Sequence, residues 1–220
     1  MVMDVAAPRA KDALRAQIVD AARKRFKHYG YGKTTMAELA ADCNCSPGNL
    51  YRYFPSKLDI ADALATEASL EVLERLRAVA HAPDRTATQR IVDFFFEDLR
   101  STYRMLDEER NIVELALTIT RERPEWANKD LARQRALLAG LLDEGHAKGE
   151  FHCPDAAFVA EMMQAATMKF RYPQLWSRLE LHELERELSG VLRLLAYGFS
   201  EDRLMDDGLC PSRQNPGHGL

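Results

Sequence analysis

The sequence predicts an all-α protein, and three observations support that prediction. Apolar residues recur at the three- and four-residue spacing of helices over most of the chain, with proline and glycine between the patterns. No segment sustains the period-two alternation of a half-buried strand. Near the start, two short helical patterns are joined by a tight turn and flanked by longer ones, which is typical of a helix-turn-helix unit. A chain of 220 residues has room for this small unit and a larger helical domain.

The composition, 46% hydrophobic and 29% charged, is that of an ordinary globular protein. No run approaches the roughly 18 consecutive apolar residues of a membrane span. The opening MVMDVAAPRAKD lacks the apolar centre of a signal peptide. We therefore expect a cytoplasmic protein without a membrane partner.

The four cysteines, Cys43, Cys45, Cys153 and Cys210, form no CxxC pair. In a reducing compartment we expect them to stay thiols. Cys153 follows His152, but neither this pair nor Cys43 with Cys45 supplies a four-ligand metal set. We predict no metal and no cofactor, and leave open a redox role for Cys43 or Cys45.

Charge is distributed unevenly along the chain. Residues 1–60 hold ten Lys and Arg against six Asp and Glu, whereas the remainder holds 20 against 28. A basic end is attracted to the phosphates of nucleic acid. An imbalance of this size also arises by chance in many proteins, so it favours a nucleic-acid partner only slightly.

The first helix is expected over residues 11–29, with Gly30 as its C-cap. A second begins at Thr35, because Thr35 and Glu38 have the spacing of a capping box, in which each side chain satisfies a backbone donor of the other. It is short and ends at Asn44, a residue type that tolerates the left-handed backbone of a sharp turn.

The third helix is the stretch SPGNLYRYF, residues 46–54. Ser46 is a good N-cap and Pro47 suits the first helical position, while Pro55 disfavours helical geometry at the residue before it. A fourth helix is expected to begin at Ser56 and to run to about Ala80. These two short helices and their neighbours form the predicted helix-turn-helix unit.

Longer helices follow Pro83. The first is capped by Thr86 with Gln89 and runs through Tyr103, and the others are expected at 111–120, 124–148, 155–170 and 182–199. The last residues hold little to bury. The predicted organisation is a flexible N-terminus (1–10), a helix-turn-helix domain (11–56), a linking fourth helix (57–83), a larger domain (84–200) and a disordered tail (201–220).

Placing residues 46–54 on a helix divides their side chains between two faces. Leu50 and Phe54 are four residues apart and can pack on the first two helices. The outward group comprises Pro47, Asn49, Arg52 and Tyr53, with Tyr51 at the margin. Asn and Arg can read base edges in a major groove, while Tyr and Lys57 can hold phosphates. The alternative is that the tyrosines cover the junction between the small domain and the fourth helix.

The stretch TTMAELAADCNCSPGNLYRYFPSK, residues 34–57, resembles the DNA-binding signature of TetR-type transcriptional regulators. The resemblance implies that Pro47, Gly48, Asn49 and Arg52 lie along the bases. It also implies that Thr35, Tyr51, Tyr53 and Lys57 hold the DNA backbone. Two departures occur in the turn, where the family usually has glycine and an aliphatic residue and this chain has Asn44 and Cys45. Neither departure alters the expected fold.

The same resemblance implies a bacterial, nucleoid-associated homodimer that binds a palindromic double-stranded operator and pairs through its last two helices. Leu188 and Leu195 are the expected interface residues. EGHAKGEF, residues 144–151, resembles the junction before those helices. The larger domain would hold a pocket for an unidentified small-molecule effector that weakens DNA binding.

Large apolar residues on the central helices are candidates for that pocket, although each also suits an ordinary core. They are Phe94, Phe95, Phe96, Tyr103, Trp126, Met162, Met163 and Phe170. Such a pocket favours an apolar or aromatic ligand with few polar groups, and the acidic balance of the domain favours a neutral or cationic one.

We therefore expect a ligand-responsive repressor and not an enzyme. The alternative is a helical enzyme in which Asp143, Glu144 and His146 form an acid–base group. Their charged neighbours on an amphipathic helix favour a solvated face instead.

Overall fold

The computed structural model describes residues 10–108, 110–171 and 179–200, and within these ranges the regular structure is entirely helical, as predicted. The expected tail and most of the expected flexible N-terminus lie outside them; Ala10 begins the first helix. The helices are α1 (Ala10–Tyr29), α2 (Met36–Asp42), α3 (Pro47–Tyr53), α4 (Lys57–Ala80), α5 (Ala87–Glu108), α6 (Arg110–Glu122), α7 (Pro124–Ala147), α8 (Ala156–Ala166), α9 (Met168–Arg171) and α11 (Leu181–Ser200).

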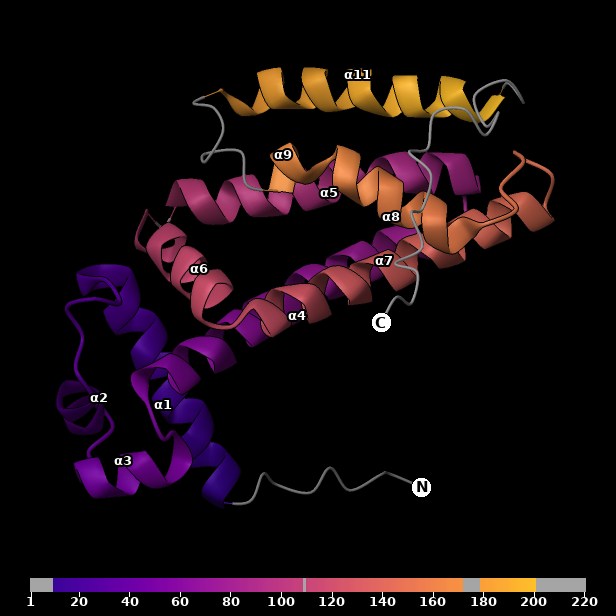
Figure 1. Cartoon of the computed structure of the whole chain (residues 1–220). Helices are drawn as coiled ribbons and strands as arrows, with labels where there is room; N and C mark the ends of the chain where they lie inside the picture. Colours follow the sequence, from indigo (N-terminus) through magenta and orange to yellow (C-terminus); the bar gives the residue numbers. More distant parts are fainter. Residues whose placement is uncertain (1–9, 109, 172–178, 201–220) are drawn as a thin grey trace, which may run out of the picture.

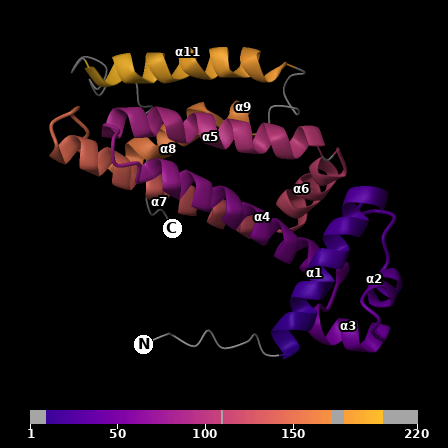
Figure 2. The same ribbon diagram turned by 180° about the vertical axis from the view of Figure 1, so that it is seen from behind.

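The molecule is L-shaped, with α1, α2 and α3 forming a small head at one end (Figure 1). The long helix α4 leaves the head and runs beside α7, and α5 packs on both of them. Helix α11 lies over α5 on the outer side, whereas α6 connects α5 to α7 and packs against α1 of the head (Figure 2). In the part of the chain described, no helix is long and apolar enough to cross a membrane.

The capping patterns begin the helices as predicted. Thr35 N–H donates to Glu38 Oε2 at 2.8 Å, and the Thr35 hydroxyl accepts from Glu38 N–H at 3.3 Å. Ser56 caps α4 by accepting from the Asp59 N–H. Asn44 adopts a φ of 50°, so the turn between α2 and α3 uses the left-handed backbone that asparagine tolerates.

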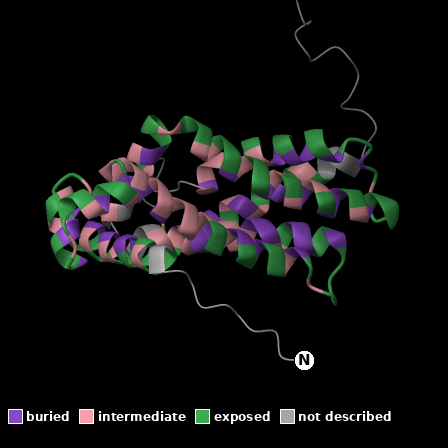
Figure 3. Ribbon diagram, turned by 90° about the horizontal axis from the view of Figure 1, so that it is seen from below, coloured by how far each residue is buried: buried purple, intermediate pink, exposed green. Residues whose placement is uncertain are grey.

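Two apolar cores hold the molecule together. Figure 3 marks the buried residues along the ribbon in purple. The head core surrounds Phe26, Leu39 and Leu50, each fully buried. It also includes Leu115 and Ile119 of α6, so α6 is part of the head's packing. The larger core is made by α4, α5, α7, α8, α9 and α11.

Two expectations for the C-terminal half are corrected. The helix expected over residues 155–170 breaks at Thr167, whose hydroxyl donates to the Met163 carbonyl at 2.8 Å and also contacts the Gln164 carbonyl, a local bond that competes with the helical ladder. Leu188, expected at a dimer interface, is fully buried within the protomer. Its substitution would therefore damage the core.

Candidate DNA-binding face and effector cavity

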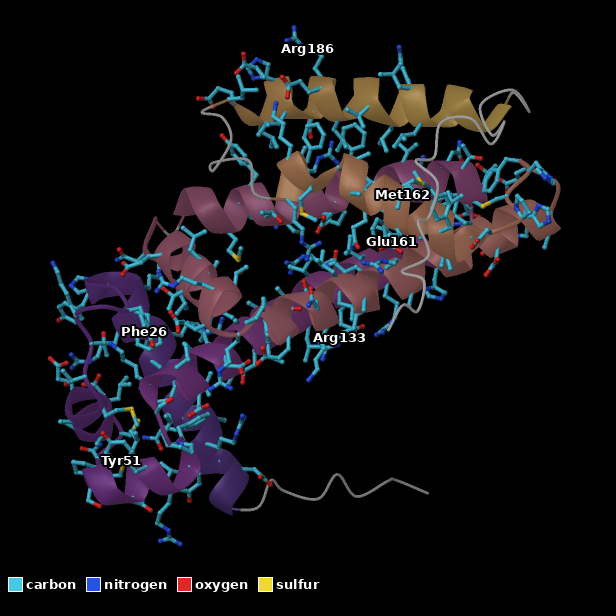
Figure 4. All side chains as sticks on the ribbon, in the orientation of Figure 1. Phe26, Tyr51, Arg133, Glu161, Met162 and Arg186 are labelled. Carbon is cyan, nitrogen blue, oxygen red and sulfur yellow. The ribbon has the colours of Figure 1, made fainter. Side chains whose placement is uncertain are left out.

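Helix α3 has one buried and one outward side. Leu50 is fully buried and Phe54, just after the helix, is 3% exposed, so this side packs on the head as predicted. Tyr51 is 50% exposed and Arg52 is also exposed. Tyr51 marks the end of the molecule farthest from α11 (Figure 4). Exposed aromatic and cationic side chains on a short, firmly anchored helix are suited to contact a partner.

The start of α3 is held by local chemistry. The Ser46 hydroxyl accepts from the Asn49 N–H at 3.2 Å, and Pro47 occupies the first turn. Pro47 and Gly48 are exposed and Asn49 is half-buried. A Cβ added to Gly48 would meet no atom within 4 Å, so the packing of the protein does not require glycine there. The open space at this position is free for a close approach by a partner.

The residues expected to hold the DNA backbone have different surroundings. Thr35 is exposed, but its side chain is used in the capping box. Tyr53 is half-buried and packs against the head core, whereas Tyr51 is 50% exposed. Lys57 Nζ donates to the carbonyls of Tyr31 and Thr34, each at 2.7 Å, and burial lowers its pKa. Lys57 therefore ties the connection before α2 to the start of α4.

A cavity of about 340 Å³ lies between α4, α5, α6 and α7. Most of its wall is apolar and is made by Leu64, Ala65, Ala68, Val72, Met105, Leu115, Ala116, Ile119 and Trp126. The Trp126 indole N–H donates to the Thr66 hydroxyl at 2.9 Å, which fixes the ring. The volume is in the range of small-molecule sites.

One end of the cavity, here called the polar floor, consists of Asp98, Asp130, Gln134 and Arg171. The Arg171 guanidinium donates to the Asp130 carboxylate and the Gln134 side-chain oxygen. Asp130 also accepts from the Ser69 hydroxyl. The Asp130 and Arg171 side chains are only 8% and 12% exposed. This floor is a bonded, nearly buried polar network inside an otherwise apolar cavity.

Asp98 is the least satisfied member of the polar floor. Its carboxylate lies 3.5 Å from Arg171 Nη1, a long distance for an ion pair, and its side chain is 16% exposed. Burial raises the pKa of Asp98 above its ordinary value because the charged form loses hydration. The carboxylate thus faces the cavity with acceptor capacity to spare.

Two family models match this chain. Residues 18–64 match the model of bacterial regulatory proteins of the tetR family, and residues 87–192 match the model of tetracyclin repressor-like C-terminal domains. The chain belongs to the TetR family.

Individual relatives agree with the family. The chain is similar to an HTH-type transcriptional repressor of Mycobacterium tuberculosis, with 40% identity over 68 residues, 31% of this chain and about a third (34%) of that protein's length. Its fold is similar to a TetR/AcrR-family regulator from Thermobifida fusca, with 26% identity, a TM-score of 0.62 and coverage of 84% of this chain and 97% of that one. It is also similar to the transcriptional regulator FadR from Bacillus subtilis, solved in complex with stearoyl-CoA, with 22% identity, a TM-score of 0.59 and coverage of 83% and 98%.

TetR-family proteins are regulators and not enzymes, which removes the enzyme alternative. The suggested acid–base residues have structural surroundings. A hydrogen bond from Arg90 holds the pKa of Glu144 at about 2, and His146 Nδ1 accepts from the Cys153 N–H at 3.2 Å. Asp143 is exposed.

The structure does not bring the expected effector residues of this TetR-family protein together. Of the seven principal candidates, only Trp126 lines the cavity above the polar floor. Met162 is 42% exposed on α8 (Figure 4). Met163 lines a separate hollow of about 430 Å³ between α5, α7, α8 and α11. The remaining candidates, Phe95, Phe96, Tyr103 and Phe170, belong to the larger core or pack against it, as does Phe94.

The sequence patterns did not predict the polar floor, although the spacing of residues on α7 indicates two of its four members, Asp130 and Gln134. Asp130, Gln134, Leu138 and Leu141 share the buried stripe of α7, so two polar residues occupy positions that helical spacing assigns to the interior. Buried polar residues on an apolar stripe indicate either a bonded network or a site. Asp98 and Arg171 lie on other helices, and no spacing rule relates them to α7.

Proposed function

We propose that this TetR-family chain is a ligand-responsive transcriptional repressor that binds a palindromic DNA operator as a homodimer and is released by a small molecule. The observation that best supports the proposal is helix α3, which is anchored by Leu50 and Phe54 and turns Tyr51 and Arg52 outward. A helix of this width fits a major groove, and a dimer would insert two of them one helical turn apart.

Within this proposal the residues that contact DNA have two tasks. Pro47, Gly48, Asn49 and Arg52 lie along the bases, where the amide and the guanidinium can each make paired hydrogen bonds to a base edge. Thr35, Tyr51, Tyr53 and Lys57 hold the DNA backbone. Lys57 has three N–H donors, and two of them bond to carbonyls. It would therefore offer one donor and its charge to a phosphate while keeping the start of α4 in place.

The proposed dimer forms through α8 and α11, the last helices of the chain. Phe158 and Met162 are one turn apart on α8 and are 46% and 42% exposed, and Leu194 on α11 is 74% exposed. These apolar side chains support an interface that buries them against their symmetry copies. Leu195 is half-buried and Leu188 is internal, so neither is the best probe of it.

The proposed link between effector and DNA is α6 with the start of α7. Leu115 and Ile119 of α6 line the cavity and also belong to the head core, and Trp126 of α7 packs against that core. Asn111 Nδ2 donates to the Lys27 carbonyl at 2.8 Å, and Arg123 pairs with Asp59 at 2.7 Å. A ligand that displaces α6 would therefore move the head, and its differential affinity for the two arrangements would shift their populations.

The test of DNA recognition is selection of bound sequences from a random pool by the purified chain. We expect a palindrome whose half-sites are about 10 bp apart, centre to centre. Arg52→Ala should lower affinity for that sequence by about 1–3 kcal/mol and change the preferred base at one position. Arg133→Ala removes an exposed arginine on α7, far from the head, and should alter neither (Figure 4). Equal effects of the two substitutions would contradict the assignment.

The dimer has its own test, because Phe158 on α8 and Leu117 on α6 are both 46% exposed. Phe158→Glu should give monomers in sedimentation experiments, since a charge would be buried at the interface. Leu117→Glu should leave the dimer unchanged. An unaltered dimer in both variants would rule out this interface.

A further inference from the structure

The charged groups around the cavity differ in depth. Arg23 and Arg75, 38% and 42% exposed, lie at the rim, where Arg23 pairs with Glu67 and Arg75 with Glu97. Arg104 is also exposed at the rim, and it has no partner among the described residues. The polar floor is deeper, because its charged side chains are 16% exposed or less. Glu71, also exposed, adds one carboxylate to the rim. A bound molecule would therefore meet carboxylates at the bottom and chiefly guanidinium groups at the mouth.

The floor has an excess of acceptors. It contains two carboxylates, Asp98 and Asp130, but a single guanidinium. Arg171 directs both terminal nitrogens at protein acceptors, and Asp130 receives hydrogen bonds from Arg171 and Ser69. Among the described residues, the one hydrogen-bonding contact of the Asp98 carboxylate is that with Arg171 at 3.5 Å. The group left to be satisfied by a ligand is thus a carboxylate.

From this arrangement we propose that the effector is an apolar amine, whose hydrocarbon or aromatic body fills the cavity and whose ammonium group donates to Asp98. The inference deepens the proposed function and rests on it in taking this cavity as the effector site. A charge-assisted hydrogen bond to a nearly buried carboxylate is among the stronger polar contacts that a protein can offer. The amine would also balance the net negative charge of the floor.

An anionic head group does not fit the floor. It would face Asp98 and Asp130, and the Arg171 donors are already directed at Asp130 and Gln134. An anion could be held at the rim, where Arg104 is unpaired among the described residues and Arg23 and Arg75 are paired but partly exposed. Its apolar body would then fill the cavity and leave the acceptor of Asp98 unsatisfied. Ser101 and Thr102 also line the cavity and could orient either kind of ligand, so they do not decide the charge.

The test compares three probes with the same chain length, namely octylamine, octanol and octanoate, in calorimetric titrations of the full-length protein. We expect octylamine to bind about tenfold or more tightly than octanol, which is the effect of one hydrogen bond to a charged group. Octanoate should bind most weakly. Fluorescence of Trp126, measured in a Trp176→Phe background, should change with the same binding curve because Trp126 lines the cavity.

Two substitutions locate the contact. Asp98→Asn keeps the shape of the side chain and should lower octylamine affinity by about tenfold while changing octanol little. Ala68→Leu fills the cavity from α4 and should weaken both probes. Asp143→Asn, an exposed carboxylate outside the cavity, is the matched control and should change nothing. Circular dichroism verifies that each variant is folded.

Three results would overturn the proposal. These are octanoate binding as tightly as octylamine, an unchanged ratio of amine to alcohol affinity in Asp98→Asn, and no binding of any of the three probes. Loss of octanoate binding in Arg104→Gln would then assign an anionic ligand to the rim. DNA selection is a separate measurement, so failure to enrich an operator would count against the proposed function and leave the cavity result standing.

Discussion

The head and the larger domain differ in the kinds of side chains that they bury. Among the described residues, the buried side chains of the head are apolar except for Thr34, and Phe26, Leu39 and Leu50 are completely enclosed among them. The larger domain buries Asp130, Gln134 and most of Arg171 beside a cavity of about 340 Å³. Close packing stabilises a domain, whereas voids and buried polar groups cost stability. The packing of the head therefore suits a rigid surface, whereas the larger domain has room for a ligand.

Helix α6 lies between the two regions and belongs to both. Its Leu115 and Ile119 pack in the head core and also line the cavity. A rigid head can transmit a displacement of α6 without absorbing it, because close-packed interiors have low compressibility. This difference in packing leads to four predictions, the first of which concerns the head.

Phe26→Ala should have the largest effect on stability. Phe26 is fully buried in the head core and its ring contacts Tyr31 edge-on. Removing such a ring costs about 3–5 kcal/mol from the lost transfer free energy and the cavity left behind. Urea unfolding followed by circular dichroism measures the change. A loss below about 1 kcal/mol would mean that the head relaxes around the void and is not the rigid region described.

The same contrast explains what the sequence predicted and what it did not. Thr35, Asn44, Ser46 and Ser56 lie within a short stretch, so their capping and turn roles follow from spacing alone, and the structure has these turns and helix starts. The cavity is assembled from α1, α4, α5, α6, α7 and α9. Which of their faces converge depends on how the helices cross, and no local pattern records that.

The composition of the site illustrates this limit. Large apolar residues such as Phe95 and Phe170 were expected in the pocket, but large side chains fill space and therefore end in the core. The cavity wall instead contains small residues, Ala65, Ala68 and Ala116, which leave space. The break at Thr167, likewise unanticipated, starts the short helix that ends at Arg171 and so supplies the floor with its guanidinium.

Arg171→Met should have the second largest effect. It removes the guanidinium that bonds to Asp130 and Gln134 and leaves two carboxylates uncompensated. Removing one partner of a buried ion pair costs about 3–5 kcal/mol, and we expect the lower end because the cavity can hold water. The double variant Arg171→Met with Asp130→Leu should recover part of this loss in urea unfolding. No recovery would show that Arg171 acts mainly through packing.

A matched pair of enlargements compares the two regions directly. Ala40 is 1% exposed in the head core, whereas Ala68 lines the cavity. Ala40→Leu should cost about 1–3 kcal/mol through overpacking. Ala68→Leu has space available and should leave thermal stability unchanged or raised. If both variants were equally destabilised, the cavity would not be open to a side chain, and the contrast between the regions would fail.

Two carboxylates of the larger domain should affect stability in opposite directions as pH changes, and this is the smallest effect. Hydrogen bonds from Arg90 and Lys148 hold the pKa of Glu144 at about 2, below the ordinary 4.5, so its contribution is present above 4.5 and is lost as pH falls toward 2. Because Glu144 is 36% exposed, that contribution is about 1 kcal/mol or less. Burial raises the pKa of Asp98, so its ionised form costs stability at neutral pH, and the cost disappears as pH falls through its raised pKa.

At neutral pH, Glu144→Gln should therefore lower the urea midpoint and Asp98→Asn should raise it, whereas in acid both variants should have midpoints close to that of the parent protein. A lower midpoint for Asp98→Asn at neutral pH would mean that the Asp98 contact with Arg171 stabilises the protein by more than the desolvation of the carboxylate costs. Asp98 would then not require a hydrogen-bond donor from a ligand.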